Sequence, residues 1–446
     1  MTSVPFTPVR IDRRSLLGGL GAATLIAPQA LAQQAGAPSP SLVLRARPAT
    51  RSIAPDGPPS ELWELITEPA APPLTFRRGE RIGVTFHNGL PVPSVLNWRG
   101  VYGAAAAEPL IVRPAVPPGG ADTFTLEADQ AWTMMCDARL LGDGQARASN
   151  SLSVIVRPDR KAETDRDEVM LIEDWRRAGD GGFLAPGHPA AADAALRYTV
   201  NGKPDRDLTL RPQERLRICF MNGCHRSVIA IRISDYQLRV IDIDGRPAEP
   251  FTARDGQIIL APGTRLGVLL DATLAPGSET PILLYDGAEP RTIGRLRITP
   301  EAPLRTQPLP DPPATAAEGL PDRLDLKNAL RVQIDLDRAP IGGWALPARF
   351  GATASPAFQV KRNRTVVLAL TNRASIPVTF HLHGHHARLL DRLDDGWKPF
   401  WLDTLAIGPG QTQRLAFQAA HGGRWLMEAL AADWAAPRQL HSYAVS

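Results

Sequence analysis

Residues 198–203 read Tyr-Thr-Val-Asn-Gly-Lys, and three related stretches follow them: Arg-Leu-Arg-Ile-Cys-Phe-Met-Asn at 215–222, Val-Ile-Asp-Ile-Asp-Gly at 240–245 and Leu-Ala-Pro-Gly-Thr-Arg at 260–265. Each is a short run of mostly apolar or β-branched residues next to a turn-forming pair such as Asn-Gly, Asp-Gly or Pro-Gly. Runs of this length, closed by turns and without helical periodicity, predict short β-strands.

Similar strand-like runs recur on both sides of these stretches. The sequence also contains 43 prolines, which remove backbone donors and disfavour long helices. Many short strands at regular spacing are typical of β-sandwiches. We therefore predict an all-β protein with one sandwich in each of three blocks, the third preceded by a proline-rich linker. The predicted bounds are 41–158, 165–300, 301–330 for the linker and 331–446.

The first 32 residues have the pattern of a targeting signal. Arg13 and Arg14 stand just before two leucines, a weakly apolar run follows at 18–27, and Ala30-Leu31-Ala32 offers small residues for cleavage. The paired arginines resemble a twin-arginine (Tat) export signal. The alternative is a general secretory leader whose arginines are incidental. Either signal predicts export, and we expect a periplasmic protein that uses the Tat route.

Composition argues against nucleic-acid binding, a transmembrane anchor and a disulfide-based fold. The chain carries 50 Lys and Arg against 46 Asp and Glu, and part of the small positive excess belongs to the leader, so no nucleic-acid footprint is indicated. No apolar run reaches the ~20 residues that span a bilayer, so no transmembrane anchor is expected. Three cysteines cannot form a disulfide framework. Cys219 and Cys224 could pair across an Asn-Gly turn, although buried free thiols are the simpler interpretation.

Further stretches make a family resemblance visible. The third block contains His381-Leu382-His383-Gly384-His385, Trp401-Leu402-Asp403-Thr404, Pro409-Gly410-Gln411-Thr412 and Gly423-Arg424-Trp425-Leu426; the first contains Asn88-Gly89-Leu90-Pro91-Val92-Pro93 and Asn97-Trp98-Arg99-Gly100. Together with the central stretches, this ordered set resembles the multicopper oxidases. The resemblance implies three Greek-key cupredoxin sandwiches in the multicopper-oxidase arrangement.

The resemblance also implies copper ligands that this chain lacks. A complete family member holds a cysteine-ligated copper and a three-copper cluster bound by four His-x-His pairs, and needs ten histidine ligands, whereas this chain has nine histidines in total. The third pair survives as His381 and His383, and the axial position falls near Gln439. Other ligand positions carry different residues: Asn97, Arg99, Glu428, Ala429, Leu430 and Trp434. The second pair falls near 136–139, where there is no histidine.

Two interpretations of the surviving residues are open. His381 and His383 with Glu428 could form a residual mononuclear site of two histidines and one carboxylate. Alternatively, they are inherited strand residues that hydrogen-bond to their neighbours. Arg99, Arg139 and Glu428 are expected to converge where the cluster would lie, with the guanidinium supplying positive charge and Glu428 pairing with it. The alternative is that these side chains reach solvent.

Three functions compete on this basis. The first is a non-enzymatic scaffold or interaction protein of the cell envelope with an unknown periplasmic partner; in general plan it resembles the copper-free, Tat-exported division protein of enteric bacteria. The second is a reduced metalloenzyme, an oxidoreductase with copper at His381 and His383. The third is a small-molecule or metal-ion carrier that uses the inter-domain cleft. We expect no catalytic residues and no cofactor at full occupancy, with copper left open at the residual site.

Overall fold

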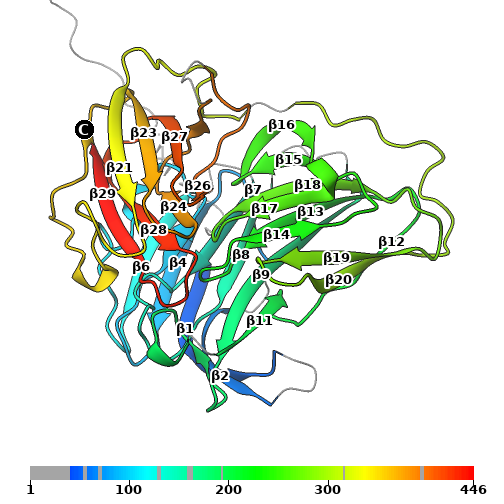
Figure 1. Cartoon of the computed structure of the whole chain (residues 1–446), viewed down its shortest axis with the longest axis horizontal. Coiled ribbons are helices and arrows are strands. Elements are labelled where there is room, and N and C mark those ends of the chain that lie inside the picture. Colours follow the sequence, from blue (N-terminus) through cyan, green and yellow to red (C-terminus); the bar gives the residue numbers. More distant parts are fainter. Residues whose placement is uncertain are drawn as a thin grey trace, which may run out of the picture. The chain divides into compact units, whose positions relative to one another are not determined.

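The computed structural model describes residues 41–53, 58–68, 73–127, 132–157, 164–191, 194–314, 317–391 and 396–446. The targeting signal predicted at 1–32 lies outside these residues. Strands dominate the described ranges, which contain four short 3₁₀ helices and no α-helix (Figure 1). The prediction of an all-β fold is confirmed. No helix within the described ranges is long and apolar enough to cross a membrane.

The first block forms two four-stranded sheets, ordered β2-β1-β4-β6 and β3-β8-β7-β5. Their inward side chains alternate with outward ones, as in β4, and enclose one apolar core. The elements are β1 (Ser41–Arg51), β2 (Ser60–Glu68), β3 (Leu74–Arg77), β4 (Arg81–Asn88), β5 (Asn97–Arg99), η1 (Ala105–Ala107), β6 (Ala121–Glu127), β7 (Trp132–Asp137) and β8 (Ser151–Arg157).

The second block has a seven-stranded sheet, in which β11 also pairs with β9, and a five-stranded sheet ordered β12-β20-β19-β14-β17. Its elements are β9 (Arg166–Arg177), β10 (Phe183–Leu184), η2 (Pro189–Ala191), β11 (Ala195–Val200), β12 (Leu208–Leu210), β13 (Arg215–Asn222), β14 (Ile229–Arg232), β15 (Arg239–Ile243), β16 (Arg246–Thr252), η3 (Arg254–Gly256), β17 (Gln257–Leu260), β18 (Arg265–Asp271), β19 (Glu279–Tyr285) and β20 (Arg291–Ile298). Every residue of β13 is buried, and Met135 of the first block packs with Cys219 and Met221 on its outer face.

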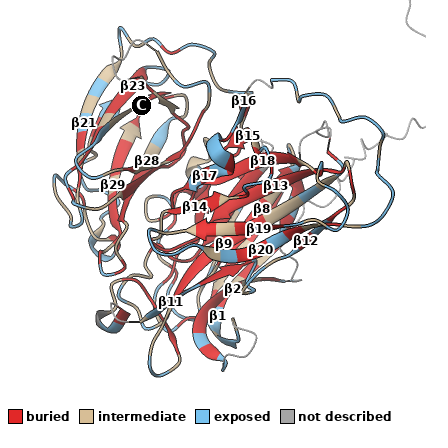
Figure 2. Cartoon of the chain, turned by 45° about the vertical axis from the view of Figure 1, so that its right-hand side comes forward, coloured by how far each residue is buried: buried red, intermediate tan, exposed pale blue. Residues whose placement is uncertain are grey.

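The third block again has two sheets, ordered β21-β23-β27-β25 and β22-β29-β28-β24-β26. Its elements are β21 (Leu330–Leu336), η4 (Pro347–Arg349), β22 (Gln359–Val360), β23 (Thr365–Asn372), β24 (Val378–Leu382), β25 (Arg388–Leu389), β26 (Thr404–Ile407), β27 (Thr412–Gln418), β28 (Gly423–Ala431) and β29 (Gln439–Val445). Strand β28 runs through the middle of its sheet and is buried over most of its length (Figure 2).

One pairing scheme is repeated in all three blocks. In each block the first strand pairs in parallel with a later strand of the same sheet: β1 with β4, β9 with β13 and β21 with β23. In the other sheet, the last strand of each block pairs in parallel with an earlier one: β8 with β3, β20 with β12 and β29 with β22. The chain therefore contains three versions of the same sandwich.

Candidate functional site

The candidate site forms where β5 of the first block approaches β24 and β28 of the third. The antiparallel register of β24 and β28 places His381 directly opposite Glu428. His383 follows the end of β24, where its N–H donates to the carbonyl of Leu426 at 3.1 Å. Asn97 enters from β5. Side chains from the first and third sandwiches thus converge on the buried carboxylate of Glu428.

Glu428 has no exposed surface and accepts from four side chains. Its Oε2 pairs with the Arg99 guanidinium at 3.0 Å and with Arg438, while its Oε1 accepts from Asn97 Nδ2 at 3.1 Å and contacts His383 Nε2 at 2.8 Å. Burial alone would raise the pKa of Glu428, but Arg99 and Arg438 hold it well below its ordinary value. The carboxylate is therefore ionised and fully paired.

His383 lies between two carboxylates. Its Nδ1 is 3.0 Å from Glu108 Oε1, and its Nε2 is held by Glu428. Burial disfavours the imidazolium, but Glu108 and Glu428 outweigh it and raise the pKa of His383 to about 9. Because both neighbours accept hydrogen bonds only, the geometry favours a doubly protonated ring at neutral pH.

The pKa of His381 is lowered, in contrast to that of His383. Its Nδ1 lies 2.9 Å from the Thr404 hydroxyl and 3.5 Å from Asp403 Oδ1. Burial and the nearby positive charge of Arg99 lower the pKa of His381 to about 4, so its ring is neutral at pH 7. The rings of His381 and His383 meet edge to face, with centroids 4.8 Å apart.

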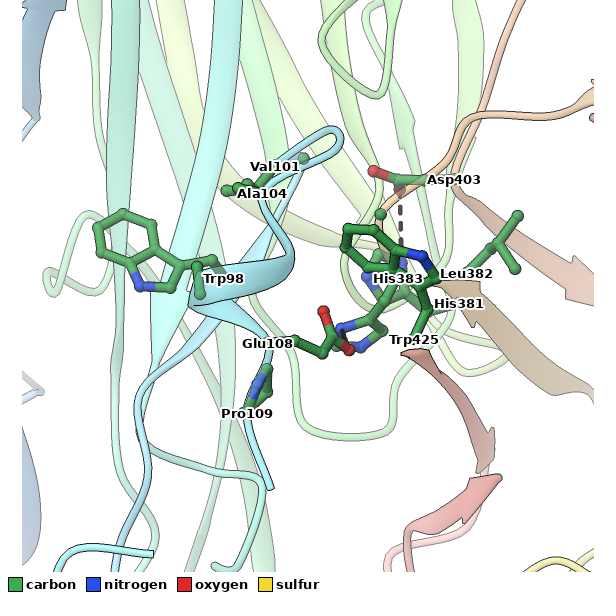
Figure 3. Close-up of a pocket in the computed structure, with 13 residues that line it drawn as sticks. Trp98, Val101, Ala104, Glu108, Pro109, His381, Leu382, His383, Asp403 and Trp425 are labelled. Carbon is green, nitrogen blue, oxygen red and sulfur yellow. Dashed lines mark ion pairs between the residues drawn. The ribbon is translucent and has the colours of Figure 1, made fainter. Parts of the chain in front are cut away.

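A small pocket adjoins these two histidines (Figure 3). Glu108 enters it from the first block, and His381, His383 and Asp403 enter from the third. The space inside holds about one water molecule. Trp425 lines another part of the wall, so the pocket is polar on one side and closed by an aromatic ring.

Titration of the two rings provides a direct check on this geometry. A folded-state pKa of about 9, against an ordinary value of 6.5, means that the stabilisation from His383 is complete below about pH 6.5 and is lost as the pH rises through 9. We expect the His383 ring resonances in an NMR titration to move near pH 9, and those of His381 to stay constant above about pH 4. A His383 midpoint near 6.5 would contradict the clamp between two carboxylates.

The structure brings together some of the predicted residues and separates others. Ligand atoms of His381, His383 and Glu428 lie within 4.8 Å of one another, and Arg99 joins them. The expectation that Arg139 converges here was wrong. Its guanidinium donates to Glu173 at 2.7 Å and to the Ser149 carbonyl at 2.7 Å, because its strand end faces β9 of the second block.

The remaining predicted positions carry structural contacts. Ala429 and Leu430 are buried. The Trp434 indole N–H donates to the Ala185 carbonyl at 3.2 Å, and Gln439 donates through its side chain to the Asp337 carbonyl at 2.7 Å. Two members of the site, Glu108 and Arg438, were missed by sequence reasoning because neither lies in a His-x-His stretch. All three cysteines are buried and free, so Cys219 and Cys224 are not paired.

A second buried ionic centre joins all three blocks. The Arg265 guanidinium, with no exposed surface, pairs with Asp403 at 2.6 Å and donates to the Thr133 carbonyl at 3.1 Å and the Asp244 carbonyl at 3.0 Å. Gly100, at φ +88°, leaves room for it: a Cβ there would come within 3.0 Å of the guanidinium.

Comparison with known families agrees with this architecture. Two family models described as multicopper oxidase match residues 168–278 and 323–437, together about half of the chain. The chain belongs to the multicopper oxidase family. A comparison with curated protein sequences finds no match.

Solved multicopper oxidases share the fold over most of the chain. The multi-copper oxidase from Pseudomonas thermotolerans superposes with a TM-score of 0.76 at 21% identity, covering 91% of this chain and 99% of the other. McoA from Aquifex aeolicus gives 0.72 at 16% identity, covering 91% and 96%. Lac15 from a marine microbial metagenome gives 0.70 at 21% identity, covering 91% and 100%. These matches confirm the predicted cupredoxin sandwiches of the multicopper-oxidase fold.

Proposed function

We propose that the mature chain is an exported, periplasmic member of the multicopper oxidase family that works without copper, as a scaffold or interaction protein of the cell envelope. The observation that carries this proposal is the set of ion pairs that surrounds Glu428. At a position where the family places a copper-ligand histidine, this chain has a carboxylate that holds Arg99, Arg438 and His383 together. The oxygens of this carboxylate are occupied by protein side chains, so the charge of Glu428 is balanced without a metal ion.

The donor set does not fit a copper ion. A histidine ligates a metal through a neutral ring nitrogen, so both protonation and hydrogen bonding must leave a lone pair free. On His383 both nitrogens face carboxylates and the pKa is raised to about 9. Glu428 is ionised, but two guanidinium groups and an amide occupy its oxygens. His381 is then the one ready donor of the three, and one imidazole does not define a copper centre.

Charge balance supports the same proposal. The cluster contains three cationic side chains, those of Arg99, Arg438 and His383. It also contains three carboxylates, those of Glu428, Glu108 and Asp137. Asp137 lies 4.0 Å from Arg99. Opposite charges in this number neutralise one another without an added cation. A divalent ion placed beside Arg99 and Arg438 would meet two like charges at close range, which disfavours its binding.

One observation favours the alternative of a reduced metalloenzyme. The potential ligand atoms of His381, His383 and Glu428 already lie within 4.8 Å of one another, so a site would need only proton loss and a shift of the two arginines. A carrier function for the adjoining pocket has less support, because the space there holds about one water molecule.

Metal content per chain tests the proposal. We expect the protein, exported by its own signal and reconstituted with copper or zinc, to retain less than about a tenth of an equivalent after dialysis. The His383→Ala and Glu428→Ala variants should give the same value, with circular dichroism confirming that they fold. Close to one equivalent in the parent chain, lost in His383→Ala, would overturn the copper-free proposal in favour of the metalloenzyme.

A further inference from the structure

Positive charge is concentrated in the third block. Residues 331–446 contain thirteen Lys and Arg against eight Asp and Glu, whereas 41–158 contain eleven of each. Between 338 and 390 there are seven Lys and Arg and no acidic residue. Such asymmetry creates a field that acts on partners beyond individual contacts.

The fold gathers part of this charge at one end of the third sandwich. Strands β21 and β23 are parallel, with Leu330 opposite Val366, so the residues just before each strand lie side by side. The Arg364 guanidinium donates to the Asn328 carbonyl at 3.3 Å across this gap. We call the exposed side chains of Lys361, Arg362 and Arg364, together with that of Lys327 at the end of the linker, the basic end.

Backbone contacts fix the basic end in place. The Arg362 N–H donates to the Ser446 carbonyl at 2.7 Å and its Nε donates to the Ala420 carbonyl at 2.7 Å. These bonds tie the loop at 361–364 to the ends of β27 and β29, near the C-terminus marked in Figure 1. Lys361, Arg362 and Arg364 are therefore carried by a loop that is hydrogen-bonded to the end of the sandwich.

Little in the described structure neutralises these charges. None of the four side chains forms an ion pair with an acidic residue that the structure describes. Asp325 is close enough to Lys327 for that lysine to contribute to its lowered pKa, after hydrogen bonds from Asn328. Four cations beside this carboxylate leave the basic end with net positive charge.

The chemistry of the surface indicates the kind of partner. Protein–protein interfaces centre on apolar and aromatic side chains. The large hydrophobic residues exposed in the described ranges, Val112, Phe251, Ile259 and Leu304, all lie outside the third block. A flat anionic surface needs neither an apolar core nor a pocket, and each Lys or Arg near it adds to the attraction.

We propose that the basic end binds the surface of an anionic phospholipid bilayer. The inference rests on the export part of the proposed function and is independent of copper. Attraction of this kind is reversible and weakens with salt, because counterions screen charges beyond about 10 Å at ~0.1 M ionic strength. The protein would then be held at the envelope membrane without a spanning segment.

Co-sedimentation of the mature chain with lipid vesicles tests the proposal. We expect binding to phosphatidylethanolamine vesicles that contain phosphatidylglycerol, no binding to phosphatidylcholine vesicles, and release at high salt. The Lys361→Gln/Arg362→Gln/Arg364→Gln variant should lose at least about tenfold in partition coefficient. No binding by the parent chain, or equal binding by this variant, would overturn the proposal.

A matched control removes the same charge elsewhere. Arg197, Arg254 and Arg295 are exposed on the second block, and changing all three to glutamine should leave vesicle binding within about twofold of the parent chain. If this variant loses as much binding as the first, overall charge causes the attraction and the basic end is not the site. Copper content is measured separately, so vesicle binding and the copper-free proposal can fail independently.

Discussion

Replacing Glu428 by alanine is expected to lower the free energy of unfolding by about 3–5 kcal/mol, because it leaves buried cations without their partner. Arg99, Arg438 and His383 all pair with this carboxylate, and none of the three is more than 4% exposed at its side chain. The pKa of Glu428 is held below its ordinary 4.5, so its contribution is complete above about that pH and is lost as the pH falls further. Denaturant or thermal unfolding at pH 7 measures the loss.

Two further variants identify its cause. Glu61→Ala removes a carboxylate that is 66% exposed and paired with Arg147, and should cost less than about 1 kcal/mol. The triple variant Arg99→Met/Glu428→Leu/Arg438→Met should recover part of the loss, since it removes both guanidinium groups along with the carboxylate but leaves the buried Asp137 without Arg99. A triple variant as unstable as Glu428→Ala would mean that lost packing, and not unpaired charge, explains the effect.

Arg265→Met should produce the second large effect, also about 3–5 kcal/mol. It leaves Asp403 without its guanidinium partner and removes donors from the Thr133 and Asp244 carbonyls, which belong to the first and second blocks. Because these contacts join three sandwiches, we expect calorimetry to show the unfolding transition broadening or splitting as well as moving to lower temperature.

The control for this prediction lies in the same block. Arg297 is 42% exposed and pairs with Asp207 and Glu279, so Arg297→Met should change the free energy of unfolding by less than about 1 kcal/mol. An Arg265→Met protein that melts at the parent temperature in one transition would show that the contacts of Arg265 do not hold the blocks together.

Much of the fold could be predicted from local sequence signals. The Asn-Gly, Asp-Gly and Pro-Gly turns delimit strands because turn geometry depends on a few neighbouring residues. Thus the apolar run at 216–221 predicts a strand, and β13 contains it with one further residue at each end. The buried outer face of β13 could not be predicted in this way, because it depends on Met135 in another sandwich.

The site was predictable only where the family pattern fixes a position. His381, His383 and Glu428 stand at such positions, and their strands bring them together. Glu108 and Arg438 do not, and Glu108 meets the backbone N–H of Leu426 across 318 residues of sequence. Arg139 was expected near Glu428 but pairs with Glu173 of the second block. Position along the chain does not reveal which of two adjoining sandwiches a long side chain enters.

The state of the cysteines has a consequence for how the protein matures. Burial raises the pKa of Cys136 well above its ordinary value and that of Cys219 to about 12, so these thiols stay protonated and unreactive. No disulfide bond has to form between these thiols, so the described fold does not depend on an oxidising compartment. If the chain is exported by the Tat route, as proposed, it can therefore complete its fold before transport without the action of an oxidant.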